Sequence, residues 1–140
     1  MEIDHDMLDL EIITPEKILV KEQVDMVEAK GAYGEFGVLP GHTQFLTTIE
    51  IGEIRYMKGG ITNYLATSGG YAEVLDDRVT ILLDDAELAE EIDVEKAKRE
   101  MEEAEKALKA LAFDENQYKL MEMALFKAIM KIEVASKRHL

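Results

Sequence analysis

The spacing of hydrophobic residues changes partway along this 140-residue chain, and this change constrains the fold more than any other feature. Up to about Leu83, apolar and polar residues alternate in short runs such as Leu8–Ile12. A period of two residues predicts strands with one buried face. Beyond Asp84-Asp85, apolar residues recur with the period of an amphipathic helix. The sequence therefore predicts a β domain over residues 1–86 and a helical domain over residues 87–140.

Turn residues separate the β-like runs of the first domain. Gly59-Gly60 lies between two such runs and predicts a two-residue hairpin. Ser68-Gly69-Gly70 leads into a further run, and Asp76-Asp77 turns the chain into another. Strands at intervals of about 8–12 residues with such turns are typical of an antiparallel sandwich or barrel. We favour an antiparallel β-sandwich.

The second domain is predicted to be an antiparallel two-helix hairpin, because the break near Phe113-Asp114 is too short to carry the chain far. Asp93 is the expected cap of the first helix, and Asp114 or Asn116 that of the second. Each helix has one apolar stripe. The stripes are Ala97, Met101, Ala104, Leu108 and Leu111, then Met121, Leu125, Ala128, Ile132 and Ala135.

The second helix carries more apolar residues than one neighbouring helix can cover. These additional residues are Leu120, Met123, Phe126, Ile129, Met130 and Val134. Either the hairpin packs on the β domain, or this helix has a second binding surface. Methionine has a flexible thioether, which suits a surface that packs in more than one setting.

The charge distribution excludes several classes of partner. Residues 1–91 contain 20 acidic and 6 basic side chains, whereas residues 92–140 contain 10 of each, so the net charge of −14 lies in the first segment. Such a surface repels phosphate backbones and anionic lipids, which argues against nucleic-acid and membrane-surface binding. The chain has no cysteine and no apolar run near the roughly 18 residues that span a bilayer. We expect a soluble intracellular protein without disulfides.

No residue pattern indicates an active site or a metal site. The histidines His5, His42 and His139 share no ligand spacing, and no serine lies in a nucleophile elbow. The pairs Asp76-Asp77 and Asp84-Asp85 are interpreted as turn formers rather than as calcium ligands or proton-sharing acids. Glycines 31, 34 and 37 lack the lysine of a P-loop and predict a bent loop. We therefore expect no catalytic residues and no required cofactor.

The segment Gly34–Thr43 is predicted to be a shaped, partly apolar loop, since Pro40-Gly41 and other turn formers surround its apolar residues. It is either a corner of the sandwich or a contact surface for a partner. The candidate contact residues are Glu35, Phe36, Val38, Leu39 and His42.

Several motifs resemble the epsilon subunit of bacterial and plastid ATP synthases. They are Gly37–His42, Ser68–Val74, Val79–Asp84 and Ile92-Asp93, in the order and spacing of that family. The resemblance extends from about Leu8 to Ala135. It implies a β-sandwich followed by a helical hairpin, in agreement with the two hydrophobic periods.

The resemblance implies a non-catalytic part in the central stalk. The sandwich of this family binds the gamma subunit and the ring of c subunits, and it couples rotation driven by protons or sodium ions to ATP synthesis. Glu35 corresponds to the position that reaches the polar loops of the ring, and His42 to one near gamma.

The resemblance also implies that the hairpin inhibits ATP hydrolysis when it extends along gamma towards the catalytic β subunits. The basic residues that correspond to this contact are Lys119, Lys127, Lys131, Lys137 and Arg138. A free-standing chaperone or adaptor with a client-binding hairpin is the alternative. The family's setting implies peripheral attachment at the cytoplasmic face of the inner membrane, through the complex, with the plastid stroma as the other location.

Some members of that family bind ATP in the folded hairpin. The corresponding positions here are Glu87, Ile92, Asp93, Lys96, Ala97, Lys127 and Lys131, of which Glu87, Ile92, Asp93 and Ala97 match the family's residues. Lysines replace arginines, and Glu103 stands at a further arginine position. A lysine lacks the planar fork of arginine, and an acid near phosphates is unfavourable. The sequence leaves open whether ATP binds as a regulatory ligand.

Overall fold

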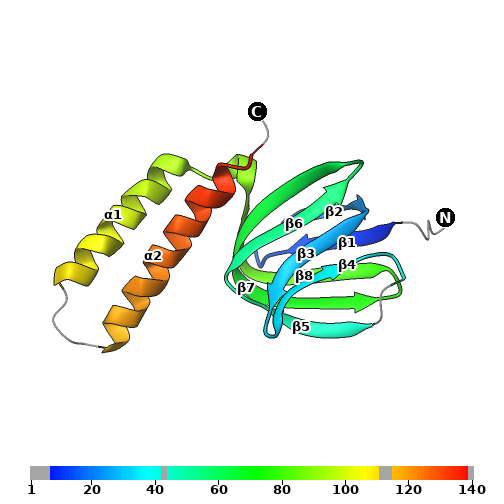
Figure 1. Cartoon of the computed structure of the whole chain (residues 1–140), viewed down its shortest axis with the longest axis horizontal. Coiled ribbons are helices and arrows are strands. Elements are labelled where there is room, and N and C mark those ends of the chain that lie inside the picture. The colour runs from blue at the N-terminus through cyan, green and yellow to red at the C-terminus, as the bar shows by residue number, and fades with distance from the viewer. Residues whose placement is uncertain (1–6, 42–43, 111–114, 139–140) are drawn as a thin grey trace. The chain divides into compact units, whose positions relative to one another are not determined.

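The computed structural model describes residues 7–41, 44–110 and 115–138. The chain divides into two compact units, residues 1–88 and 89–140, which are treated separately below. Strands make up the first unit and helices the second, so the predicted β-sandwich followed by a helical hairpin is confirmed (Figure 1).

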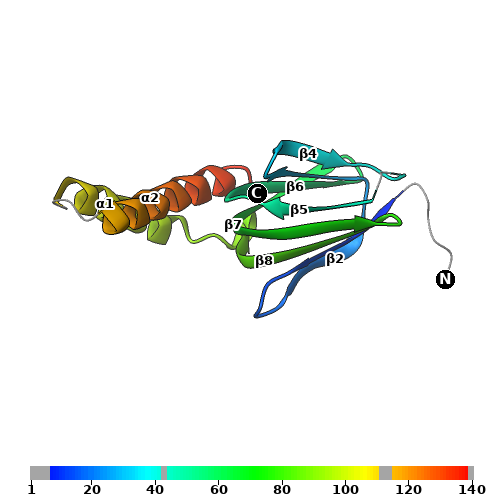
Figure 2. The same cartoon turned by 90° about the horizontal axis from the view of Figure 1, so that it is seen from below.

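The sandwich is one eight-stranded sheet that curls around its core (Figures 1 and 2). Its strands are β1 (Leu8–Ile13), β2 (Ile18–Val24), β3 (Met26–Gly31), β4 (Gly34–Val38), β5 (Phe45–Ile49), β6 (Gly52–Lys58), β7 (Ile61–Leu75) and β8 (Arg78–Leu88). The order is β2-β1-β8-β7-β5-β3-β4, and β6 pairs with both β3 and β7. All pairs are antiparallel except β1–β8, which is parallel. The sandwich is thus antiparallel as predicted, with one parallel pair.

Alternation along the strands builds the core. In β1 the side chains of Leu8, Leu10 and Ile12 are buried and that of Asp9 is exposed, which confirms the period of two. Side chains from all eight strands meet in one hydrophobic cluster that includes Val24, Val27, Val38, Ile49, Ile54, Leu65, Val74 and Ile81. Burial of this apolar surface is the main force that holds the sandwich together.

Strand β7 is longer than the sequence suggested. Ser68-Gly69-Gly70 precedes no new strand but lies inside β7, where the register with β8 shifts on either side of Gly69. Gly69 has φ +120°, a region that favours glycine. The bulge bends β7, so that its first part pairs with β6 and its second part with β5, while β8 pairs with β7 on both sides of the bulge.

The two aspartate pairs have different roles. Asp76 and Asp77 form the turn between β7 and β8 with φ values of 49° and 61°, which confirms their assignment as turn formers. Asp84 and Asp85 lie within β8, so the same assignment is wrong for them. Asp85 pairs with Gly69 across the β7–β8 ladder. Backbone pairing along the extended β7 outweighs the turn propensity of these two acids.

The second unit consists of the short 3-10 turn Ala89–Glu91, α1 (Val94–Ala110) and α2 (Glu115–Ala135), with the helices side by side (Figures 1 and 2). The Lys96 N–H donates to Asp93 Oδ1 at 3.0 Å, which confirms Asp93 as the cap of α1. Asn116 lies inside α2 and is not its cap, while Asp114 lies outside the described residues.

Both predicted stripes face inward in the hairpin, as far as they are described. Ala97, Ala104, Ala128 and Ala135 are buried, and the larger stripe residues are half-buried. Small residues at these positions let two helices approach closely. Leu111 lies outside the described residues.

Candidate functional site

The predicted contact segment is mostly strand rather than loop. Gly34–Val38 forms β4, which pairs antiparallel with β3 through the register Gly31↔Gly34. Gly34 has φ +112° and permits the tight connection from β3, whereas the φ values of Gly31 and Gly37 are not positive. The prediction of a bent loop is therefore wrong for this part of the segment. The backbone of this segment pairs with β3, and local turn residues do not predict that pairing.

Pairing with β3 separates the candidate contact residues into two faces. Val38 is fully buried in the core, and Phe36 is half-buried with its ring edge-on to Phe45, 5.4 Å between centroids. Val38 is therefore not exposed for contact, and Phe36 is exposed only in part. Leu39 is exposed, and His42 lies outside the described residues.

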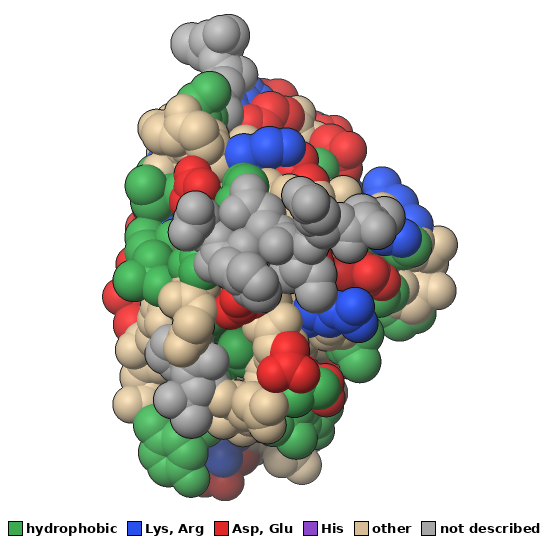
Figure 3. Space-filling view, turned by 90° about the vertical axis from the view of Figure 1, so that its right-hand side faces the viewer, with side chains coloured by type: hydrophobic (Ala, Val, Ile, Leu, Met, Phe, Trp, Pro, Cys, Tyr) green, Lys and Arg blue, Asp and Glu red, His purple; other side chains and the backbone are tan. Residues whose placement is uncertain are grey.

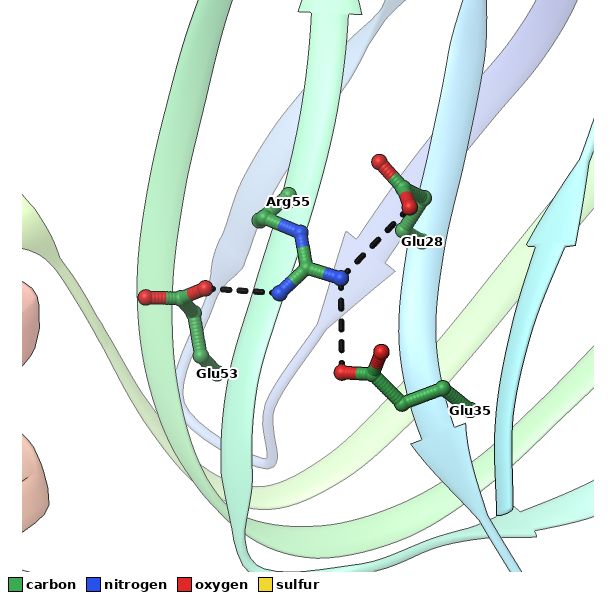
Figure 4. A network of polar contacts seen from close by, with 4 residues as sticks. All are labelled: Glu28, Glu35, Glu53 and Arg55. Carbon is green, nitrogen blue, oxygen red and sulfur yellow. Dashed lines mark hydrogen bonds and ion pairs between the residues drawn. The ribbon is translucent and has the colours of Figure 1, made fainter. Parts of the chain in front are cut away.

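Glu35 lies on the outer face, where it joins a cluster around Arg55 (Figure 4). Arg55 Nη1 lies 2.8 Å from Glu53 Oε2. Its Nη2 lies 3.4 Å from Glu35 Oε1 and 3.5 Å from Glu28 Oε2. The hydrogen bond to Glu53, with the negative charges of Glu28, Glu35 and Glu53, raises the pKa of Arg55 in spite of its partial burial.

Strand register explains why these four side chains meet. Glu28 is directly opposite Arg55 in the β3–β6 pair, so both point to the same face. Glu53 lies two residues before Arg55 on β6 and shares that face. Lys30 is two residues beyond Glu28 and lies opposite Glu35 in the β3–β4 pair. Three strands thus place one guanidinium among three carboxylates.

Sequence reasoning missed Arg55. The spacing Glu53-x-Arg55 is the one local signal, since side chains two apart in a strand share a face. The contributions of Glu28 and Glu35 depend on the pairing of β3 with β4 and β6, which a single sequence does not specify.

A second connection joins the β7–β8 turn to the chain around Pro40-Gly41. The Gly41 N–H donates to Asp77 Oδ1 at 2.7 Å. On the other side of residues 42–43, Gln44 Nε2 donates to Asp76 Oδ1 at 3.4 Å. The two aspartates therefore form a turn and also accept hydrogen bonds from Gly41 and Gln44.

An apolar stripe lies on the outer face of β5, β7 and β8. Leu46, Tyr71 and Leu82 have relative exposures of 70%, 59% and 50%. Tyr71 pairs directly with Leu82, and it also pairs with Thr48, which shares a strand face with Leu46. Figure 3 shows hydrophobic side chains along one edge of the visible face, with acidic and basic side chains scattered among other groups elsewhere. Exposed apolar area of this kind marks contact surfaces.

The basic candidates of the hairpin differ in exposure. Lys119, Lys137 and Arg138 are exposed, whereas Lys127 and Lys131 are half-buried on α2. Of the additional apolar residues of this helix, Met130 and Val134 are buried. The others remain exposed, and they are Leu120, Met123, Phe126 and Ile129.

The groove described on the hairpin is not lined by the positions that match the ATP-binding motif. Ile92 and Ala97 are buried, and Asp93 is engaged in capping α1. Glu87 belongs to β8 of the other unit. The hairpin has a groove of about 370 Å³, and its lining contains none of the candidate ATP positions. That lining is Val94, Lys98, Ile132, Ala135, Ser136 and Arg138.

Within the described ranges, no three acidic, histidine or cysteine side chains are grouped to hold a metal ion. In the same part of the chain, neither helix is long and apolar enough to cross a membrane.

Comparisons with known proteins match both units of the chain. Residues 7–89 match the family model of the ATP synthase delta/epsilon chain β-sandwich domain, and residues 90–136 that of its long α-helix domain. The ATP synthase epsilon chains of Geobacter metallireducens and Geobacter sulfurreducens are each 48% identical over 130 residues, covering 93% of this chain and 94% of theirs.

Solved structures agree with these matches. A chain in the cryo-EM structure of the Euglena gracilis mitochondrial ATP synthase (OSCP, F1 and c-ring) is similar with a TM-score of 0.77 and 28% identity, over 95% of this chain and 82% of that one. A chain in the central stalk and c-ring structure from Tetrahymena thermophila shares the fold, with a TM-score of 0.59 and 11% identity, over 91% of this chain and 96% of that one.

Proposed function

This chain belongs to the ATP synthase delta/epsilon chain family as an epsilon subunit, and we propose that it couples rotation to ATP synthesis and restrains ATP hydrolysis. The observation that best supports this proposal is the match of both units, in order, to the two domains of that family. The subunit acts by binding and has no catalytic residues of its own.

The sandwich is the coupling element in this proposal. It docks on the gamma subunit and on the ring of c subunits, and Glu35 faces the ring. Two features support such docking, namely the exposed Glu35 carboxylate of the cluster around Arg55 and the apolar stripe of Leu46, Tyr71 and Leu82. Torque transfer requires a stiff body, and a close-packed core drawn from all eight strands supplies that stiffness.

The hairpin is the regulatory element. Its second helix exposes Leu120, Met123, Phe126 and Ile129 alongside basic residues. In an extended state, these apolar side chains contact gamma, and Lys119, Lys127, Lys131, Lys137 and Arg138 approach the catalytic β subunits. Two packings that each cover one apolar face differ by only a few kcal/mol, so partners select between them.

The site of action follows from the complex. We place the subunit at the cytoplasmic face of the inner membrane, peripheral to it and attached through gamma and the c-ring. The net charge of −14 supports attachment through proteins rather than through anionic lipid.

Deletion of residues 92–140 tests the regulatory part. Enzyme assembled with the remaining sandwich is expected to hydrolyse ATP faster, because the element that restrains hydrolysis is gone. The control is the same enzyme with the full chain, with equal amounts of subunit bound to both. Equal hydrolysis by the two assemblies would refute inhibition by the hairpin. Loss of the truncated chain from the complex would instead contradict docking through the sandwich.

A further inference from the structure

Arg55 forms ion pairs with three carboxylates, which differ in their distance from the guanidinium and in their exposure. Glu53 makes the shortest contact, 2.8 Å, and its side chain is only 15% exposed. Glu28 lies at 3.5 Å with 36% exposure. Glu35 lies at 3.4 Å, and its side chain is 68% exposed. Two carboxylates on β3 and β6 therefore anchor the guanidinium, and the third, on β4, is the one that solvent and a partner reach.

The contribution of the Arg55–Glu35 contact to stability is a weak explanation for its presence. Ion pairs at exposed positions contribute little to the free energy of folding, so we expect the Arg55–Glu35 contact to add little to stability. A guanidinium held by Glu53 and Glu28 nevertheless stays in place when Glu35 changes partners. Its planar fork directs Nη1 to Glu53 and Nη2 to Glu35, so the two contacts do not compete for the same nitrogen.

We propose that Arg55 is a positioning residue that holds the Glu35 carboxylate in the orientation needed to accept hydrogen bonds from the partner ring. This inference rests on the proposed function, in which Glu35 faces the ring of c subunits. Holding Glu35 before contact reduces the side-chain entropy lost on binding, since a free glutamate samples many rotamers. The three carboxylates exceed the Arg55 guanidinium by two negative charges, or by one when Lys30, opposite Glu35 in the β3–β4 register, is counted. This remaining negative charge favours a donor or cation from the partner.

A double-mutant cycle on the full-length chain tests this role. Affinity for a detergent-solubilised rotor of gamma subunit and c-ring is measured for the wild type, Glu35→Gln, Arg55→Met and the double variant. Glu35→Gln is expected to weaken binding about threefold to fivefold, as for a partly exposed charged contact. Arg55→Met is expected to weaken it about threefold in the wild type and to add no loss in the Glu35→Gln background.

A matched control removes the effect of net charge. Lys58 lies on the same strand β6 and pairs with Glu22 at 3.3 Å, away from Glu35 in the sheet register. Lys58→Met makes the same charge change as Arg55→Met and is expected to leave affinity unchanged. If Arg55→Met does not fold, Arg55→Lys is measured against the same criterion, because lysine keeps the charge but lacks the fork.

The outcomes distinguish the positioning role of Arg55 from the docking of Glu35. If the Arg55 substitution lowers affinity equally with and without Glu35, or lowers it in neither background, the positioning role is overturned. The docking of Glu35 is then unaffected. If Glu35→Gln binds the rotor with wild-type affinity, the proposed contact between Glu35 and the ring is contradicted, and so is the positioning role of Arg55.

Discussion

Gly70 offers a sharp test of the packing between β7 and β8. A Cβ at this position would overlap the Leu82 carbonyl oxygen and would lie 2.8 Å from Leu83 Cα and 2.9 Å from the Leu82 carbonyl carbon. All these atoms belong to the backbone of β8, so no side-chain rotation relieves the overlap. Gly70→Ala therefore requires the two strands to move apart.

The cost follows from that separation. Ordinary contacts at a Cβ are about 3.4–4 Å, so the strands must separate locally by more than an ångström at the Leu82 carbonyl oxygen. Overpacking of this kind costs about 1–3 kcal/mol, and each ladder hydrogen bond lost adds about 1 kcal/mol. We expect Gly70→Ala to lower the free energy of unfolding by about 2–4 kcal/mol, a large part of the ~5–15 kcal/mol of a small domain.

Urea denaturation of the full chain, followed by circular dichroism of the sandwich, measures this loss. With a slope of about 1.5 kcal/mol/M, the urea midpoint is expected to fall by about 1.3–2.7 M. Gly37→Ala is the matched control, because a Cβ there lies 3.6 Å from a flexible Glu28 side chain and the backbone needs no positive φ. Its midpoint is expected to stay within about 0.5 M of the wild type. Equal midpoints for both variants would refute the steric argument.

Two further predictions concern side chains that accept hydrogen bonds from backbone amides. Asp77→Asn keeps both the acceptor for the Gly41 N–H and tolerance of φ 61°, whereas Asp77→Gly keeps only the tolerance of φ 61°. Denaturation is expected to show Asp77→Gly less stable than Asp77→Asn by about 1 kcal/mol, and equal stability would exclude a contribution from this hydrogen bond. Asp93→Ala removes the cap of α1 and is expected to cost the hairpin about 0.5–2 kcal/mol in thermal unfolding, with Asp93→Asn near the wild type. Equal unfolding of these two Asp93 variants would contradict the capping role.

Local signals were sufficient where one residue and its near neighbours decide the structure. Gly59-Gly60 joins β6 to β7 with φ values of 59° and 79°, as a two-residue turn between strands requires. Asp93 caps α1 because its carboxylate reaches an amide three residues on. The same local reasoning failed at Asp84-Asp85 and at β4, where a distant strand supplies the hydrogen-bonding partner.

The candidate site shows the same division. Glu35 was singled out from its motif, and the structure places its side chain on the exposed outer face. Val38, from the same motif, is buried, because alternation along β4 sends successive side chains to opposite faces. Whether a residue of this segment faces the core or a partner depends on strand pairing, which the turn residues of the sequence do not specify.

The sequence alone determined that a sandwich precedes a helical hairpin, because hydrophobic period is a local property that each stretch of chain carries with it. Tertiary structure alone decided that Arg55 meets Glu28 and Glu35, that Asp77 holds Gly41, and that β1 runs parallel to β8. These contacts join residues far apart in sequence, and their partners are selected by the register and packing of the whole sheet.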